Sequence, residues 1–550
     1  MISTNWVTEE SGILANHYVN QPKPIRVIVL GAGIAGIAFA YKAREIENVF
    51  FQIYEKNSDV GGTLFESRYP GVSCDVPAHS YTFTWEGNPD WTKFYASGEE
   101  IEAFYQRLAK EYGVYQQTKF KHQIEGAVWD DEAGLWRITV KHLETGESFV
   151  DSAEVFVNCG GVLNNWQWPS IEGLDKFRGA LVHTASWDDG LDLKGKRVAV
   201  IGSGASAIQV VPTIQPIVQQ LVSFHRSPSW VAAEFAGQLA SQGRNTIYTE
   251  KEKQRFRQDP EYFLSYRREI EHGMNARFPS FYRDSDAQKL GIENVTKSMR
   301  TRLGNNPELC EKLIPKFPLG CRRVTPGHGY LEALTAGNVV VETSHIARIT
   351  ETGVTTVDGK LHEVDVIVTA TGYVTSFVPR FPIVGLEGRD LQQEWTKKGA
   401  RGYLSVTVPG MPNYFSTTGP NSPISNGSLI PVIEHQVDFA LKFKRKKKNQ
   451  DLHHVVVTEK ATAEFNEWKD EFMKGMTWTG NCTSWYKNGT VDGTVIGPWP
   501  GSVNHFLSIL KQPRFEDFEY RYRSRNRFRY FGDGRAANEA KGQPLGAYIS

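Results

Sequence analysis

The sequence predicts an α/β protein with two Rossmann-like dinucleotide-binding domains, one for FAD and one for NADP, and a helical insertion in the NADP domain. Two glycine-rich loops carry this prediction, Gly31-Ala-Gly33-Ile-Ala-Gly36 and Gly202-Ser-Gly204-Ala-Ser-Ala207. Each loop follows a short apolar run, at residues 25–30 and 196–201, as expected for a parallel strand buried on both faces. Either motif alone would be weak evidence, but together they suggest two dinucleotides held face to face.

The first unit has the residues expected for binding an adenosine dinucleotide. Gly31, Gly33 and Gly36 allow a tight turn, close approach of the backbone to a pyrophosphate, and close packing of helix on strand. The helix that follows offers unpaired N–H groups to the phosphates. The next predicted strand, residues 49–54, ends at Glu55, whose carboxylate suits a ribose 2′-hydroxyl and repels a 2′-phosphate. This site should therefore take FAD or NAD and not NADP.

The second unit repeats the pattern with one change of charge. Its loop contains Ser206, and its next predicted strand, residues 221–225, is followed by Arg226 and Ser227 where the first unit has an acid. A guanidinium can pair with a phosphate through two hydrogen bonds. The exchange of acid for base therefore indicates the 2′-phosphate of NADP.

The domain organisation follows from the order of these units. We expect an N-terminal arm at residues 1–24, an FAD-binding domain at 25–170 and 366–550, and an NADP-binding domain at 171–365. The pattern becomes helical and charged at about residues 240–316, which predicts the insertion. A third buried strand is expected at 364–369, and it runs into Ala370-Thr371-Gly372.

Composition limits the class of partner and the location. The chain has 550 residues and a formal net charge of zero, so nucleic acid and anionic membranes are not expected partners. The basic run at residues 442–448 is expected to be a solvated helix face or loop. No apolar run approaches the ~20 residues of a membrane span, and the N-terminus shows no secretory signal. We therefore expect a cytoplasmic protein; the sequence leaves the oligomeric state open.

The cysteines form an odd, scattered set of five without a C-x-x-C pair: Cys74, Cys159, Cys310, Cys321 and Cys482. This usage fits a reducing cytosol. It argues against a metal site, a disulfide scaffold and a dithiol-disulfide reductase.

Between the glycine loops lies the run Phe177-Arg-Gly-Ala-Leu-Val-His183-Thr-Ala-Ser-Trp187-Asp188. It resembles the fingerprint of type I Baeyer–Villiger monooxygenases, which are FAD- and NADPH-dependent class B flavoprotein monooxygenases. The resemblance covers roughly residues 24–506 and includes, in the family's order, the first glycine loop, the fingerprint, the second glycine loop and Ala-Thr-Gly. A further matching segment is residues 61–75. The family's fingerprint lies on a linker between the nucleotide domains. We therefore expect a hinge or packing role for Phe177, His183 and Trp187, and no direct chemistry.

The resemblance implies an oxidoreductase that uses FAD, NADPH and O₂ as cosubstrate to convert a ketone to an ester or lactone through a C4a-peroxyflavin. Arg323 matches the family's active-site arginine, a fixed cation suited to a peroxide and a developing oxyanion, and Asp75 matches the acid that orients it. Arg322 matches a base near the NADP phosphate, and Trp485 a tryptophan on a mobile loop. Cofactor contacts are expected from Gly31, Gly33, Gly36, Glu55, Gly62, Thr63, Asp75, Gly202, Gly204, Ser206, Arg226, Ser227, Arg322, Thr371, Gly372 and Trp485. The substrate should be a small, apolar carbonyl compound.

The sequence departs from the family pattern at two places. Leu64 stands where the family carries a tryptophan near the flavin, and Lys487-Asn488-Gly489 replaces a glycine-rich loop after Trp485. Two alternatives stay open: a flavin-dependent N- or S-oxygenating monooxygenase, and a redox-neutral enzyme on the same scaffold. Substrate-dependent consumption of NADPH would separate the second alternative from both oxygenases.

Overall fold

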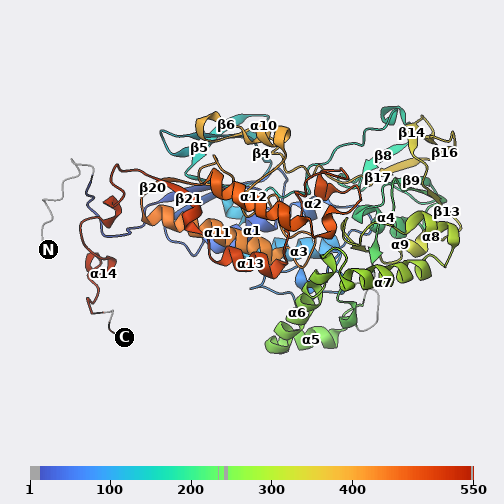
Figure 1. Cartoon of the computed structure of the whole chain (residues 1–550), viewed down its shortest axis with the longest axis horizontal. Coiled ribbons are helices and arrows are strands. Elements are labelled where there is room, and N and C mark those ends of the chain that lie inside the picture. The colour runs from blue at the N-terminus through green and yellow to red at the C-terminus, as the bar shows by residue number, and fades with distance from the viewer. Residues whose placement is uncertain (1–12, 233–234, 241–245, 547–548, 550) are drawn as a thin grey trace.

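The computed structural model describes residues 13–232, 235–240, 246–546 and 549, so residues 1–12 of the predicted N-terminal arm lie outside the described residues. Figure 1 shows an elongated molecule, with helix α1 (Ile34–Ala43) in the middle of the long axis and strands β9 (Arg197–Ile201) and β17 (Val366–Thr369) toward one end. Within the described residues, every helix is too short or too polar to pass through a lipid bilayer.

The first sheet is parallel throughout and has the strand order β19-β7-β1-β2-β3. Its strands are β1 (Ile25–Leu30), β2 (Val49–Tyr54), β3 (Thr118–Lys119), β7 (Val155–Asn158) and β19 (Tyr414–Ser416). Val27, Ile28 and Val29 of the central strand are fully buried, because both faces of the sheet are covered. Val27 and Val29 share a hydrophobic cluster with residues of α1, and Ile28 shares one with Trp136 and Ile138 of a neighbouring sheet. The predicted strand–loop–helix order of the first unit is therefore present, with α1 directly after the glycine loop.

The second sheet is also parallel, with the order β13-β10-β9-β17-β8. Its strands are β8 (Ala180–His183), β9, β10 (Gln220–Phe224), β13 (Val339–Glu342) and β17, and helix α4 (Ala205–Ile214) follows β9. The α/β fold class with two Rossmann-like units is confirmed. Strand β17 pairs with β8 and β9, so we propose that the chain returns to the first domain after Thr369 instead of at residue 366.

Smaller sheets and helices complete the two units. The additional strands are β4 (His122–Asp130), β5 (Leu135–His142), β6 (Ser148–Ala153), β18 (Ile383–Val384), β20 (Leu452–Val457) and β21 (Phe518–Tyr522), together with the antiparallel β14 (Ile346–Ile349), β15 (Gly353–Thr356) and β16 (Leu361–Glu363). Further helices are α3 (Gly98–Glu111), α7 (Asp286–Arg302), α11 (Ile430–Asn449), α12 (Glu459–Met473) and α13 (Val503–Lys511). Helix α11 packs on α1 and α13 and covers the first sheet.

Part of the basic run is buried, contrary to the expected solvated face. The run lies in α11, where Lys444 and Lys447 are 2% and 4% exposed. The Lys447 ammonium donates to the carbonyls of Leu452 and His453, at 2.6 Å each. These carbonyls lie at the start of β20, so the lysine is covered by a strand that only the tertiary fold brings over the helix. Burial lowers the pKa of Lys447 to about 7.

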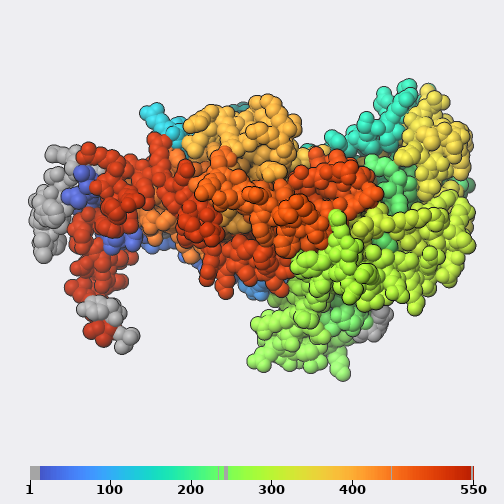
Figure 2. Space-filling model, viewed as in Figure 1, coloured from blue at the N-terminus to red at the C-terminus, as the bar shows by residue number. Residues whose placement is uncertain are grey.

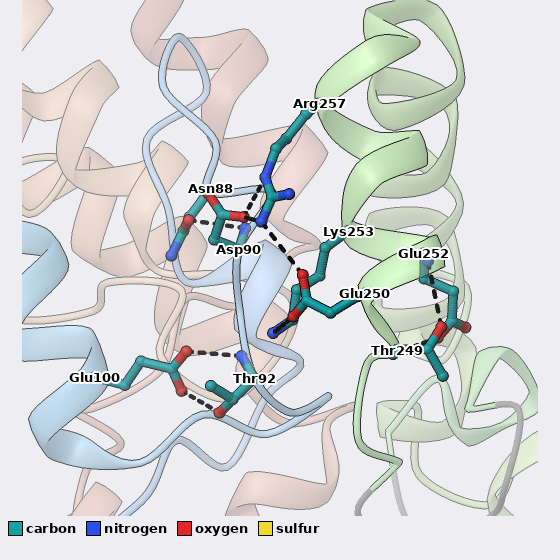
Figure 3. A network of polar contacts seen from close by, with 9 residues as sticks. All are labelled: Asn88, Asp90, Thr92, Glu100, Thr249, Glu250, Glu252, Lys253 and Arg257. Atoms are coloured by element: carbon teal, nitrogen blue, oxygen red, sulfur yellow. Dashed lines mark hydrogen bonds and ion pairs between the residues drawn. The ribbon is translucent and has the colours of Figure 1, made fainter.

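The predicted helical insertion includes α5 (Glu250–Gln258), α6 (Pro260–Asn275), α7 and α8 (Pro307–Leu313). Figure 2 shows α5 and α6 as a light-green lobe that projects from the body of the molecule. This lobe packs against the first unit through an ion pair between Arg257 of α5 and Asp90 (Figure 3). Thr249 and Glu252 form a capping box at the start of α5. The Arg257–Asp90 pair is about half exposed, so it fixes geometry more than it adds stability.

His79 joins this lobe to the first unit through aromatic packing. Its ring lies 5.2–5.4 Å from the rings of Tyr248, Phe256, Phe263 and Tyr266, with edge-to-face geometry in all four pairs. The imidazole is 2% exposed, and neither ring nitrogen has a hydrogen-bond partner among the residues that the structure describes. Burial, with a smaller effect from the nearby Arg267 charge, lowers the pKa of His79 to about 3. The side chain is therefore neutral and structural.

Acid should destabilise the folded chain through His79. Below pH 6.5 the unfolded chain binds a proton that folded His79 accepts only near pH 3, so the free energy of unfolding falls by up to about 1.4 kcal/mol per pH unit in that window. We expect His79→Phe to reduce this pH dependence, as measured by urea unfolding at pH 7, 6 and 5. His272→Gln, on the exposed face of α6, is the matched control and should keep the wild-type slope. Equal slopes for His79→Phe and the wild type would contradict the prediction.

The cysteine pattern was expected to argue against a disulfide scaffold, yet one pair of cysteines is bonded. Cys321 and Cys482 form a disulfide, whereas Cys74, Cys159 and Cys310 are free and buried. The bonded residues are 161 positions apart, so their spacing carries no signal. The fold brings their segments together, as the close approach between the backbone of Gly480 and the ring of Pro318 also shows.

Candidate functional site

A large cleft runs along the carboxyl ends of both parallel sheets, where nucleotides bind in doubly wound folds. Its volume is about 1610 Å³, more than one ordinary ligand pocket needs. Of the residues predicted for cofactor binding or catalysis, all but Gly36 line it: Gly31, Gly33, Glu55, Gly62, Thr63, Asp75, Gly202, Gly204, Ser206, Arg226, Ser227, Arg322, Arg323, Thr371, Gly372 and Trp485. The two nucleotide units therefore share one cavity with the arginine and acid predicted for catalysis.

The first glycine loop is shaped by backbone contacts that exclude side chains. Gly31 has φ +94°, and a Cβ there would lie 3.0 Å from the carbonyl oxygen of Cys159. Gly36 is one turn into α1, and a Cβ on it would lie 2.2 Å from the carbonyl oxygen of Gly31. Gly36 allows α1 to pack closely against the glycine loop. This packing role explains why Gly36 does not line the cleft. The start of α1 has no side-chain cap, which leaves its N–H groups for a phosphate.

Glu55 lies at the end of β2 beside this loop. Its carboxylate accepts hydrogen bonds from the backbone N–H of Ala32 at 2.8 Å and of Asn57 at 2.9 Å. The residue is 4% exposed, and burial raises its pKa while the two N–H groups oppose that rise. The carboxylate is thus fixed at the place where the ribose of a bound dinucleotide is expected.

Two arginines without a carboxylate partner in the described residues lie at the second site. Arg322 donates to the Ser227 hydroxyl at 2.8 Å and to the Thr483 carbonyl at 2.6 Å. Burial lowers the pKa of Arg322, and the positive charge of Arg226 lowers it further. Two like charges near one another, with a hydroxyl bound to one of them, are suited to an anion with several oxygens, such as a 2′-phosphate.

Arg323 and Asp75 form an ion pair in the cleft. The Asp75 carboxylate accepts from Nε of Arg323 at 2.9 Å and from Nη2 at 2.6 Å, while Nη1 donates to the Ile424 carbonyl at 2.7 Å. Asp75 raises the pKa of Arg323 well above its ordinary value. The Arg323 side chain is 32% exposed and lines the cleft, so the fixed cation faces the cavity.

Two contacts that position this pair had no signal in the sequence. The Ile424 carbonyl is a backbone group, and any residue could supply it. Gln209, on the helix after the second glycine loop, accepts from the Tyr69 hydroxyl at 2.8 Å and donates to the Ser73 carbonyl at 2.9 Å. It thereby ties the second unit to the segment that ends at Asp75. A glutamine within a helix belongs to no motif.

The loop with Trp485 is compact. Trp485 lines the cleft and packs on Tyr486, with ring centroids 4.6 Å apart. The buried Lys487 ammonium donates to the carbonyls of Gly480 at 2.7 Å and Val491 at 2.5 Å. In the Lys-Asn-Gly sequence that replaces the family's glycine-rich loop, the lysine therefore holds the two sides of the loop together through hydrogen bonds to backbone carbonyls.

His183 packs beside the cleft without lining it. Its ring stacks on Trp166 at 4.6 Å and 16°, and Nε2 lies 3.2 Å from the Thr371 hydroxyl. Burial lowers its pKa to about 4, so the ring is neutral near pH 7. These contacts support the predicted packing role. Leu64, in the short helix α2 (Thr63–Glu66), does line the cleft, so the departure from the family pattern is within the site.

Comparisons with known proteins agree with this architecture. The model of the NAD(P)-binding Rossmann-like domain matches residues 29–97. The chain is 41% identical over 525 residues to the FAD-binding monooxygenase tazF of Aspergillus terreus, covering 94% of this chain and 93% of that protein. It is 33% identical over 503 residues to a Baeyer-Villiger monooxygenase of Pseudomonas aeruginosa, covering 90% and 92%.

Solved structures share the fold. A cyclohexanone monooxygenase of Rhodococcus bound to NADP⁺ superposes with a TM-score of 0.79 at 24% identity, over 91% of this chain and 100% of that one. An oxidized steroid monooxygenase bound to NADP gives 0.77 at 25% identity, again over 91% and 100%.

Proposed function

Since this chain belongs to the family of flavin monooxygenases that contains the FAD-binding and Baeyer–Villiger monooxygenases, we propose that it uses NADPH and O₂ to convert a ketone into an ester or lactone. The observation that carries the proposal is the Arg323–Asp75 ion pair, which faces the cavity shared by two dinucleotide sites. A ketone oxygenase needs a permanent cation at this place, whereas oxygen transfer to a soft nucleophile does not build an oxyanion on carbon.

The residues on each side of the cleft fit the two cofactors. The first glycine loop, the uncapped start of α1 and Glu55 would hold FAD, and the start of α4 with Arg226, Ser227 and Arg322 would hold NADPH. Bound FAD would accept hydride from NADPH and react with O₂, chemistry that no amino-acid side chain supplies. The protein's own part is binding, orientation and electrostatics.

Arg323 would stabilise negative charge on oxygen. One oxygen atom of O₂ enters between the carbonyl carbon and its neighbour, and the other leaves as water, with NADPH and a proton supplying the reducing equivalents. When the carbonyl carbon is attacked, its oxygen would gain negative charge, and the fixed guanidinium of Arg323 would lower the free energy of that charge. Asp75 and the Ile424 carbonyl hold that guanidinium on three of its N–H groups, so little reorganisation is needed.

The surrounding chain would keep water away from the reaction. Trp485, the buried Tyr486 and the lysine-closed loop cover the cavity beside Arg323. A dry site strengthens the ion pair's effect on the reacting oxygen and limits the loss of reduced oxygen as peroxide.

Product analysis under ¹⁸O₂ tests the proposal. Purified enzyme with FAD and NADPH is given a panel of apolar ketones, a tertiary amine and a thioether. We expect ¹⁸O in an ester or lactone, with one NADPH oxidised per product. An N-oxide or sulfoxide as the only labelled product would favour the alternative of an N- or S-oxygenating monooxygenase. Turnover without NADPH consumption would favour a redox-neutral enzyme.

A further inference from the structure

We infer that the Cys321–Cys482 disulfide is a positioning cross-link for the oxygenation reaction. It holds Arg322 and Arg323 against the Trp485 loop, so that NADPH binds tightly and oxygen is transferred to the substrate efficiently. The inference rests on the proposed roles of Arg322 and Arg323. It concerns two residues outside the sixteen predicted cofactor positions and the Arg323–Asp75 ion pair. It assigns them a function in coupling NADPH oxidation to oxygenation of the substrate.

The disulfide joins the two segments that bring charge and cover to the cleft. Cys321 directly precedes Arg322 and Arg323, and Cys482 lies three residues before Trp485. Their Cα atoms are 6.3 Å apart, within the range that a disulfide spans. Both cysteines are buried, at 0% and 4% exposure. Among the described residues this is the one disulfide between these segments, which are 161 positions apart in the chain.

A hydrogen bond runs beside the cross-link. Arg322 donates through Nε to the carbonyl of Thr483, the residue after Cys482, and through Nη2 to Ser227 of the predicted phosphate site. The same guanidinium therefore touches the loop and the NADPH site. If the disulfide opens, this contact and local packing must hold the loop alone, and Arg323, one residue further along, loses a covalent anchor.

The disulfide can form from two thiols with hydrogen peroxide as the oxidant, which the enzyme would release when NADPH oxidation is not coupled to oxygenation. Two thiols give up two protons and two electrons, the S–S bond forms, and hydrogen peroxide is reduced to two molecules of water. A dithiol reverses the reaction by thiol–disulfide exchange and is itself oxidised to a disulfide. Peroxide from uncoupled turnover would thus close the cross-link that restores coupling.

A thiol count and two kinetic readouts test the inference. Peroxide-treated protein denatured without reductant should show three free thiols, Cys74, Cys159 and Cys310, and five after reduction. Reduced enzyme and the Cys321→Ser/Cys482→Ser variant should need roughly 10- to 100-fold more NADPH for half-maximal anaerobic flavin reduction, as expected when one hydrogen bond to a charged group at the NADPH site is lost. With a ketone, they should release more peroxide per NADPH, and reoxidation should rescue only the wild type.

The control is Cys310→Ser, in α8, which removes a buried free cysteine. It should show two free thiols before reduction and four after, and wild-type values in both kinetic measurements. Five free thiols after peroxide treatment would overturn the cross-link. Unchanged NADPH half-saturation and unchanged peroxide yield in both the reduced enzyme and the serine variant would overturn its positioning role. If no ketone is oxygenated, the proposed function fails, and the thiol count and anaerobic NADPH titration still decide this inference.

Discussion

Replacing Arg323 with alanine is expected to lower the rate of ester formation by about 10²–10³-fold, while FAD stays bound and NADPH is still oxidised. The guanidinium is the charged group that Asp75 and the Ile424 carbonyl fix in the cleft. Without it, negative charge on the reacting oxygen atoms has no permanent counter-charge, and reduced oxygen leaves as hydrogen peroxide. The measurement is the ratio of ester to peroxide per NADPH, with the flavin content read from absorbance.

Arg323→Lys separates charge from geometry in the same experiment. Lysine keeps a positive charge but cannot donate in the planar arrangement that reaches both Asp75 and Ile424. We expect an intermediate loss of ester formation and more peroxide than in the wild type. Ester formation at the wild-type rate in Arg323→Ala would show that oxygen transfer does not depend on this cation, and the proposed role would be wrong.

The parts of the fold that the sequence predicts well are those specified over short distances. The apolar runs before both glycine loops are strands β1 and β9, and the helices begin at the predicted loops. Local sterics explain this success: Gly31 and Gly202 have positive φ, and a Cβ on Gly202 would lie 2.4 Å from the Ala370 carbonyl oxygen. Such constraints leave a mark at the residue itself.

The parts that were missed depend on contacts between distant segments. The pairing of Cys321 with Cys482 and the burial of Lys447 under the start of β20 both arise from tertiary packing. The site was predictable where a motif surrounds the residue, as at Arg226. It was not predictable where a carbonyl or a helical glutamine does the positioning, because those groups occur everywhere in a chain.

The charge at the second site should determine coenzyme preference. Arg226→Ala is expected to raise the KM for NADPH by roughly 10- to 100-fold and to leave the KM for NADH nearly unchanged, because a guanidinium–phosphate contact contributes the difference. Arg226 lies close enough to lower the pKa of Arg322, so the two cations repel each other until a phosphate lies between them. Steady-state NADPH and NADH oxidation with FAD-saturated enzyme measures the effect.

Salt dependence distinguishes phosphate recognition from a general disturbance of the fold. Raising the ionic strength should weaken NADPH binding to the wild type more than to Arg226→Ala, because screening acts on a charge pair that the variant lacks. Arg300→Ala, an exposed arginine in α7, should keep both the wild-type KM values and the salt response. Equal losses with NADPH and NADH in Arg226→Ala would contradict a phosphate contact. Loss with NADPH alone would mean that the single exchange of acid for base, Glu55 in one unit and Arg226 in the other, assigns the two dinucleotides to their sites.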